Sequence, residues 1–187
     1  MEEPVIINMM RNMTVDGGIV LEDVHHFYPN ITKLYRGRPE MLIMKMKNGR
    51  NLQMFRKGKA QILGHVSEGD AENMRHEFIA KLRRLKTMQS KETRRVSEMI
   101  ISNMVMSVQL KKKLCPNKVL WSDSNVFHET ELFPATLIRK WHPVHIALFH
   151  NGKVILTGLK STSDFYNAMN LLNVYLESSH FFCEIVQ

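Results

Sequence analysis

The chain has 187 residues, a formal net charge of +8 and a hydrophobic content of 44%. These values suit one full domain or two small ones with a packed core, and they exclude a disordered chain. No apolar stretch approaches the ~20 residues of a membrane span, and the acidic N-terminus lacks the order of a signal peptide. Cys115 and Cys183 cannot build a disulfide framework, and no spacing indicates a metal or cofactor. We therefore expect a soluble intracellular protein with an anionic partner and no membrane association.

The first half of the chain predicts a strand, a short helix, three strands and a long helix. The expected elements are Val5–Thr14, Leu21–Phe27, Met41–Lys47, Asn51–Arg56, Lys59–Gly64 and an amphipathic helix from Ala71 to Leu85. Glycine in Lys57-Gly58 supplies the positive φ of a tight hairpin. The second half predicts the same order. Its elements are Ser97–Leu110, Val119–Phe127, Thr136–Trp141, His145–Phe149, Lys153–Thr157 and a helix from Phe165 to Tyr175.

The two halves are copies of one another at the level of single residues. Identities recur 94 residues apart at Phe55/Phe149, Gly58/Gly152, Lys59/Lys153, Gly64/Gly158, Ser67/Ser161 and Asp70/Asp164. Such a constant spacing indicates a duplication. We predict one repeat over residues 1–90 and a second over residues 91–187.

The repeated pattern β-α-β-β-β-α predicts an α+β fold. One long and one short helix per copy can cover only one face of an antiparallel sheet. Two fused copies predict one continuous curved sheet with four helices on its convex face. Eight strands can be counted from the sequence, with room for one further short strand in each half.

The chain resembles the TATA-box-binding protein family. The motifs that carry the resemblance are Glu131-Leu-Phe-Pro134, Ser102-Asn-Met-Val105 and the run from Gly152 to Gly158. The resemblance covers about Val5 to Tyr175 and is stronger in the second repeat. It implies a saddle of about ten strands whose concave face binds and bends the DNA minor groove. It also implies that the convex side and the end loops recruit transcription factors.

The resemblance assigns DNA-binding roles to residues in both repeats. Asn8 and Asn103 match a pair of asparagines at the centre of the groove, where amides can read the A·T edge. Phe55, Phe133 and Phe149 match three of four intercalating phenylalanines. Core packing is the alternative for these rings. However, strand alternation places Phe55 and Phe149 on the face opposite to Met54 and Leu148.

The first repeat departs from the family pattern more than the second. The fourth phenylalanine position falls at Arg38 or Pro39, and Gln53 and Gln61 stand at apolar family positions. Met10 and Leu63 replace a valine and a threonine. The second repeat keeps Val105 and Thr157. The two glutamines could read base edges, or they could equally mark a surface that no longer contacts DNA.

Basic residues occupy family positions that contact phosphate. They are Lys45, Lys59, Arg139, Lys153 and Lys160. As a set they favour an anionic ligand, because each neutralised phosphate adds affinity without reading sequence. The net charge is +5 over residues 1–90 and +3 over residues 91–187. The first repeat is therefore the more basic half, although its base-reading positions are the more altered.

One end loop resembles the family segment that contacts the transcription factor TFIIB. Glu129, Glu131 and Leu132 occupy the contact positions, and an acidic loop beside a leucine suits a basic partner with an apolar socket. A solvated loop is the equal alternative. The segment Tyr28–Tyr35 does not resemble the TFIIA-contacting segment, so that contact is lost or replaced.

The sequence is compatible with two classes of function and gives no support to a third. The first is a nuclear transcription initiation factor, or a viral one at the site of viral transcription, that bends promoter DNA. The second is a protein–protein adaptor that keeps the fold and has lost TATA recognition. The third, an enzyme, has no constellation of catalytic side chains to support it.

Overall fold

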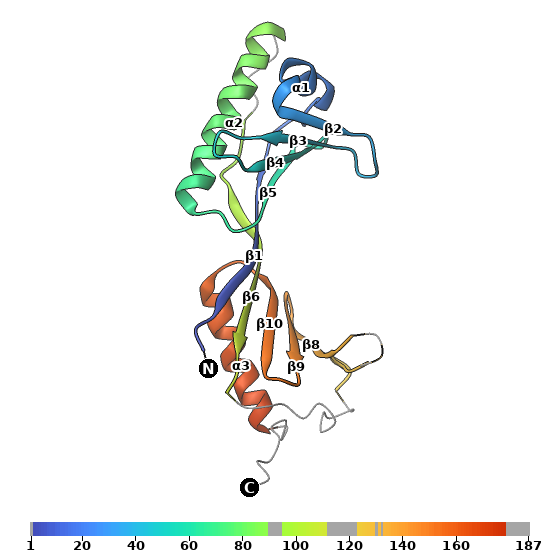
Figure 1. The fold of residues 1–187 in the computed structure, drawn as a ribbon, viewed down its shortest axis with the longest axis vertical. Helices are drawn as coiled ribbons and strands as arrows, with labels where there is room; N and C mark the ends of the chain where they lie inside the picture. The colour runs from blue at the N-terminus through green and yellow to red at the C-terminus, as the bar shows by residue number, and fades with distance from the viewer. Residues whose placement is uncertain (1, 90–94, 112–122, 130, 132, 179–187) are drawn as a thin grey trace. The chain divides into compact units, whose positions relative to one another are not determined.

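The computed structural model describes residues 2–89, 95–111, 123–129, 131 and 133–178 (Figure 1). It divides into two compact units. We call Met9–Ser102 the N-unit, and Met1–Asn8 together with Asn103–Gln187 the C-unit. No helix in these described ranges has the length and apolar character needed to cross a membrane.

Ten strands of the described residues form one antiparallel sheet in the order β2-β3-β4-β5-β1-β6-β10-β9-β8-β7. The strands of the first half are β1 (Val5–Thr14), β2 (Thr32–Tyr35), β3 (Met41–Lys45), β4 (Asn51–Phe55) and β5 (Lys59–Leu63). Those of the second half are β6 (Ile100–Gln109), β7 (Val126–Phe127), β8 (Ala135–Trp141), β9 (Val144–Phe149) and β10 (Lys153–Leu159). The eight predicted strands are confirmed to within three residues at either end, and β2 and β7 are the two short additional strands.

The two long strands β1 and β6 each contribute to both units. Within the C-unit, the backbone N–H of Glu2 donates to the carbonyl of Gln109 at 3.0 Å. Within the N-unit, the N–H of Ser97 donates to the carbonyl of Thr14 at 2.9 Å. The C-unit therefore contains the start of β1 and most of β6, and the N-unit contains the rest of both strands. The predicted division at residues 90 and 91 stays a prediction.

The described residues contain three α-helices and one short 3-10 turn. The helices are α1 (Leu21–Phe27), α2 (Glu68–Gln89) and α3 (Thr162–Ser178), and the turn η1 is Pro29–Ile31. The prediction of a fourth helix over Val119–Phe127 is wrong where the structure describes it. Val126 and Phe127 form strand β7, opposite Ile138 and Leu137 of β8. Residues 119–122 of that prediction lie outside the described residues. The β-branched and aromatic side chains at 126 and 127 favour the strand.

The repeated Ser and Asp residues begin the two long helices. In α2, the Asp70 N–H donates to Ser67 Oγ at 3.1 Å, and that hydroxyl donates to Asp70 Oδ2 at 2.9 Å. In α3, the Asp164 N–H donates to Ser161 Oγ at 3.1 Å. The Asp164 carboxylate accepts from the N–H groups of Lys160 and Ser161. These bonds satisfy donors that a helix start leaves unpaired, and they hold the pKa of Asp164 below its usual value.

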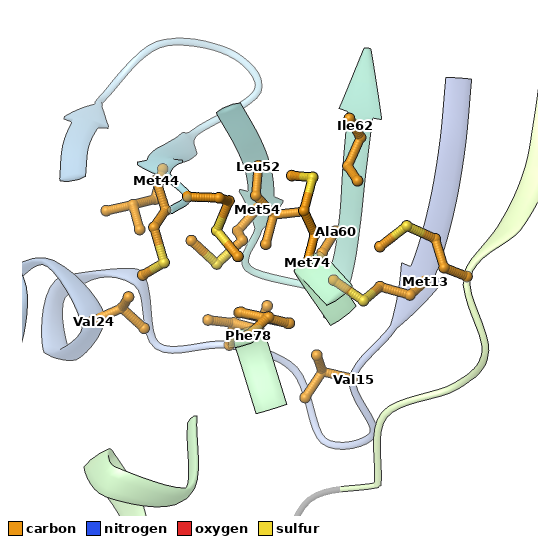
Figure 2. Close-up of a cluster of buried hydrophobic side chains, with 14 of the residues drawn as sticks. Met13, Val15, Val24, Met44, Leu52, Met54, Ala60, Ile62, Met74 and Phe78 are labelled. Carbon is orange, nitrogen blue, oxygen red and sulfur yellow. The ribbon is translucent and has the colours of Figure 1, made fainter. Parts of the chain in front are cut away.

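The core of the N-unit lies between one face of its sheet and helices α1 and α2. Buried positions alternate along β3, β4 and β5, so Met44, Met54 and Ile62 all point to the helices. Figure 2 shows several methionine side chains gathered around the ring of Phe78, which α2 contributes. Unbranched Met side chains fill irregular space of this kind. The high Met content therefore has a packing role here.

The core of the C-unit repeats this arrangement against α3, which runs beside the C-unit strands in Figure 1. Its buried strand residues are Met104, Met106, Val108, Ile138, Ile146, Leu148, Val154, Leu156 and Leu159. Helix α3 supplies Phe165, Ala168, Met169, Leu172 and Leu176. The spacing read from the sequence is confirmed for Phe165, Ala168, Met169 and Leu172, whereas Tyr175 is only half-buried and Leu176 takes the last core position. In each unit the opposite sheet face, here called the open face, has no described helix on it.

Candidate nucleic-acid interface

The phenylalanines at the ends of β4 and β9 lie on the open faces. Phe55 follows Met54, which is fully buried, and Phe149 follows Leu148, which is 1% exposed. Both rings are half-buried and point away from the helices because successive strand residues alternate. The predicted orientation of these two rings is therefore confirmed.

Two phenylalanines lie together on the open face of the C-unit. The rings of Phe133 and Phe149 have centroids 6.0 Å apart and an interplanar angle of 63°. Phe133 is 43% exposed, although it is one of the largest apolar side chains in the described residues. Beside it the face has a hollow of about 420 Å³. Its lining residues are Phe133, Leu137, Arg139, His145, Ile146, Ala147, Ile155 and Thr157.

Asn103 is oriented by a hydrogen bond from the neighbouring strand. The N–H of Gly158 donates to Asn103 Oδ1 at 3.0 Å, so the amide oxygen is used and the NH₂ group keeps its two donors. Gly158 has φ +84°, and a Cβ there would collide with the carbonyl oxygen of Pro143. A glycine is therefore required for this contact. Val105 and Thr157 are half-buried on the same open face.

The repeated hairpins set a phenylalanine and a lysine at a fixed separation. The Gly58 N–H donates to the Phe55 carbonyl, and the Gly152 N–H donates to the Phe149 carbonyl, both at 2.9 Å. The two glycines have φ values of +95° and +85°. Lys59 and Lys153 follow directly and are exposed. Each hairpin thus presents an aromatic ring on one strand and a cation at the start of the next.

Five of the basic candidates lie on the surface of the part of the chain that the structure describes. Lys45, Lys59, Arg139, Lys153 and Lys160 are all exposed, and none makes an ion pair with another described residue. The guanidinium of Arg139 lies 5.1 Å from the ring centroid of Phe127, a favourable cation–π geometry. Other cations are used within the protein. Lys140 pairs with Asp123, and Arg56 pairs with Glu22 and Glu40.

These ion pairs also shift the titration of their acids. The Arg56 guanidinium, which donates to both oxygens of Glu22, holds the pKa of that carboxyl below its usual value. The Asn125 backbone N–H and then Lys140 lower the pKa of Asp123.

Within the described residues, no group of three or more His, Cys, Asp or Glu side chains could hold a metal ion.

The open face of the N-unit is more polar than that of the C-unit. Arg38 and Pro39, at the fourth phenylalanine position, are exposed, so Phe55 has no aromatic neighbour from that position. The Gln61 Nε2 donates to Gln53 Oε1 at 2.9 Å across β5 and β4. Met10 and Leu63 lie opposite each other on β1 and β5. Leu63 is 47% exposed.

The acidic end loop is partly described. Glu129 and Glu131 are exposed, the Phe133 N–H donates to the Glu129 carbonyl at 2.9 Å, and His128 Nδ1 is 3.0 Å from Thr136 Oγ1. Leu132 lies outside the described residues. The hydrogen bonds of Phe133 and His128 hold the ends of the loop close to β8.

Asn8 is exposed on β1, in the segment that belongs to the C-unit.

The sequence did not single out several residues that line the open faces. Leu137 and Ile155 line the C-unit hollow, and Asn12 lies opposite Gln61. The period-2 alternation in β8 and β10 could have found the first two, since each follows or precedes a buried residue. The position of Asn12 beside Gln61 depends on the register of two strands far apart in sequence.

Comparison with known proteins gives consistent matches. A family model described as "Transcription factor TFIID (or TATA-binding protein, TBP)" matches residues 98–178. The TATA-box-binding protein of Thermococcus celer is 31% identical over 127 residues, which is 67% of this chain and 65% of that protein. The one of Pyrococcus furiosus is 31% identical over 123 residues, 65% of this chain and 62% of that protein. The matched region thus spans slightly less than two thirds of these relatives.

A solved structure matches over a greater share of the fold. The structure described as "Methanococcus jannaschii TBP" has a TM-score of 0.70 and 25% sequence identity. The match covers 95% of this chain and 99% of that chain. It therefore includes both units and extends well beyond the residues matched by the family model.

Proposed function

Because the chain is a divergent member of the TATA-box-binding protein family, we propose that it is a transcription initiation factor that binds and bends promoter DNA through an A·T-rich minor groove. The matched relatives are named for TATA-box binding. The observation that carries the proposal is the pair of partly exposed rings, Phe133 and Phe149, on the open face of the C-unit.

These two rings serve as the wedge that bends the DNA. Minor-groove architectural proteins insert apolar side chains between base steps, which unstacks them and kinks the duplex. Phe133 and Phe149 form a T-shaped pair, and Phe133 lines the hollow together with Leu137 and Ala147. Aromatic side chains have few rotatable bonds, so such a pair can unstack bases with little loss of side-chain entropy on binding. Phe55 makes the corresponding contact from the N-unit.

Asn103 and Asn8 donate hydrogen bonds to the floor of the groove. The minor-groove edges of A·T pairs carry only acceptors, adenine N3 and thymine O2. Asn103 already accepts from Gly158, so its amide presents donors that match those acceptors. Val105 and Thr157 form the adjoining wall. The exposed cations contact the phosphates of both strands: Lys45, Lys59, Arg139, Lys153 and Lys160.

The end loop binds a TFIIB-like factor. Glu129 and Glu131 are exposed beside β8 and supply the negative charge, and Leu132 supplies an apolar contact. An exposed acidic loop of this kind steers a basic partner toward the protein and adds specificity. The site of action is the nucleus, or the site of viral transcription for a viral protein. The function involves no catalysis and no cofactor.

A second candidate function is an adaptor that has kept the fold and lost TATA-specific DNA binding. The polar face of the N-unit favours it, because Gln53 and Gln61 replace apolar contacts and positions 38 and 39 lack a phenylalanine. The adaptor predicts that a TFIIB-like partner is captured without DNA and that Glu131→Arg abolishes capture.

The deciding experiment measures binding and bending of end-labelled duplexes by fluorescence energy transfer across a salt series. We expect the A·T-rich duplex to be bound more tightly than a G·C-rich control. We also expect the distance between the ends of the A·T-rich duplex to shorten when the protein binds. Equal affinities with no bending would refute the DNA-bending function and leave the adaptor. Phe133→Ala serves as the variant that loses bending, with Tyr166→Ala on the outer side of α3 as its matched aromatic control.

A further inference from the structure

The open face of the N-unit carries a row of three amide side chains. Asn12 of β1 lies opposite Gln61 of β5, and Gln61 lies opposite Gln53 of β4. We call these three residues the amide row. All three are half-buried, so their side chains are partly fixed by their neighbours. The row continues onto Ile43 of β3.

The C-unit has different chemistry at the equivalent positions. Ile155 of β10 lies opposite Ser107 of β6 and Ala147 of β9, and Ala147 lies opposite Leu137 of β8. Ile155 and Ala147 are the 94-residue counterparts of Gln61 and Gln53. The same two sheet positions therefore present aliphatic groups in one unit and carboxamides in the other.

The amide row has hydrogen-bonding capacity that the protein does not use. Gln61 Nε2 donates to Gln53 Oε1 at 2.9 Å, which fixes both side chains. Gln61 Oε1 accepts no hydrogen bond from a described residue. The Oδ1 of Asn12 is buried and likewise has no partner within the described part of the chain. Gln61 Oε1 is not among the buried atoms, so a donor from a ligand can reach it, whereas the buried Oδ1 of Asn12 lies beneath the surface of the row. A ligand that brings a donor to Gln61 Oε1 would fill the acceptor that the row leaves open.

The minor groove offers one such donor. A·T pairs present only acceptors there, whereas a G·C pair adds the exocyclic 2-amino group of guanine. Against an aliphatic wall this group would lose its water without gaining an acceptor. Against a carboxamide oxygen it can donate a hydrogen bond, while the amide NH₂ can still donate to guanine N3.

We infer that the amide row recognises the 2-amino group of guanine, so that the half of the DNA site bound by the N-unit contains G·C pairs and the half bound by the C-unit contains only A·T pairs. This inference rests on the proposed minor-groove function and names the base sequence that the N-unit takes. It assigns a reading role to Gln53 and Gln61, with Asn12 supporting Gln61.

The test isolates the amino group by comparing guanine with inosine, which lacks it. One G·C pair is placed in either half of an A·T-rich duplex, and each duplex is made with guanine and with inosine. In one half we expect guanine to be bound at least about fivefold more tightly than inosine, a typical effect of one base contact. In the other half we expect inosine to be bound more tightly.

Reciprocal variants show which unit reads which half. Gln53→Ala/Gln61→Ile gives the N-unit the side chains of its counterpart and should abolish the preference for guanine in that half. Ala147→Gln/Ile155→Gln should abolish the preference for inosine in the other half. Urea unfolding monitors both variants. If the first unfolds, Gln61→Met keeps the length of the side chain and removes its amide.

The outcomes separate the two claims. Tight binding and bending of the all-A·T duplex, with inosine preferred or indifferent in both halves, would overturn the role of the amide row and leave the proposed function standing. Absence of binding to every duplex would overturn the proposed function and this inference together. A guanine preference that survives Gln53→Ala/Gln61→Ile would show that other residues read the amino group.

Discussion

The two units place different side chains at matched positions of their open faces. The C-unit has Phe133 where the N-unit has Arg38 or Pro39, and it has Val105 and Thr157 where the N-unit has Met10 and Leu63. The buried faces differ less, because apolar residues recur at most core positions of the strands; Thr136, the counterpart of Leu42, is a buried exception. Packing constrains a buried side chain in either unit, whereas an open-face side chain is constrained only by what binds there. The two units therefore differ most on the faces that no described helix covers.

The largest expected effect is the loss of stability when a core phenylalanine is removed, and it tests whether the two cores contribute equally to the free energy of unfolding. Each long helix has one fully buried phenylalanine, Phe78 in α2 and Phe165 in α3. Phe78→Ala and Phe165→Ala should each lower the free energy of unfolding by about 3–5 kcal/mol, because a large cavity is left. Urea denaturation measures both. A loss below about 1 kcal/mol for one of them would contradict the equal packing of the units.

The next prediction sharpens the contrast between the open faces. Phe149→Ala should reduce DNA bending more than DNA binding, since the wedge unstacks base steps. Phe55→Ala should have a smaller effect on bending, because no phenylalanine stands at position 38 or 39. Fluorescence energy transfer between duplex ends gives the bend, and the same titration gives the affinity. An unfolded Phe149→Ala protein would contradict the placement of that ring on the open face.

A smaller effect is expected for the helix caps. Ser67→Ala and Ser161→Ala should each cost about 1 kcal/mol of stability, because a helix N–H loses its acceptor. Urea denaturation measures both losses.

The stability that the cap of α3 contributes should also depend on pH. The lowered pKa of Asp164 stabilises the fold above the ordinary carboxyl pKa, and this contribution is lost as the pH falls through the folded-state pKa. Urea midpoints from pH 7 to pH 3 for wild type and Asp164→Asn test this. A wild-type pH dependence equal to that of the variant would contradict it.

The smallest expected effect is on the salt dependence of DNA binding, and it should be the same for a lysine of either unit. Lys59→Ala and Lys153→Ala should each flatten the dependence of log affinity on log salt by about one unit, since each lysine neutralises one phosphate. Both lysines follow a hairpin glycine at matched positions. Glu68→Ala, at the start of α2, serves as a charge control. An unchanged slope for Lys59→Ala would indicate that the N-unit hairpin lies away from the DNA.

Much of the fold could be predicted from the sequence because its signals are local. The bounds of β1 and α1 agree with the prediction, and alternation in β4 and β9 placed Phe55 and Phe149 correctly. The short strands β2 and β7 were anticipated without positions, because four and two residues are too few to show a period. Val126 and Phe127 have side chains that favour a strand, but the pairing with β8 that makes them one cannot be read from two residues.

The candidate site was predictable in part for the same reason. A side chain's face follows from alternation within one strand, so Gln53 and Gln61 could be assigned to the open face. Their mutual hydrogen bond and the neighbouring Asn12 follow from register between strands, which the sequence alone does not specify. The orientation of Asn103 likewise depends on Gly158, which lies on another strand.

The sharing of β1 and β6 between the units affects how the duplication can evolve. Residues 2–8 belong to the unit formed largely by the second half, where Glu2 bonds to Gln109. A gene fragment ending near residue 90 would encode this strand segment without its partner, and the remaining fragment would lack that segment. The open faces of the two halves can therefore diverge, but neither half by itself encodes every strand segment of its unit.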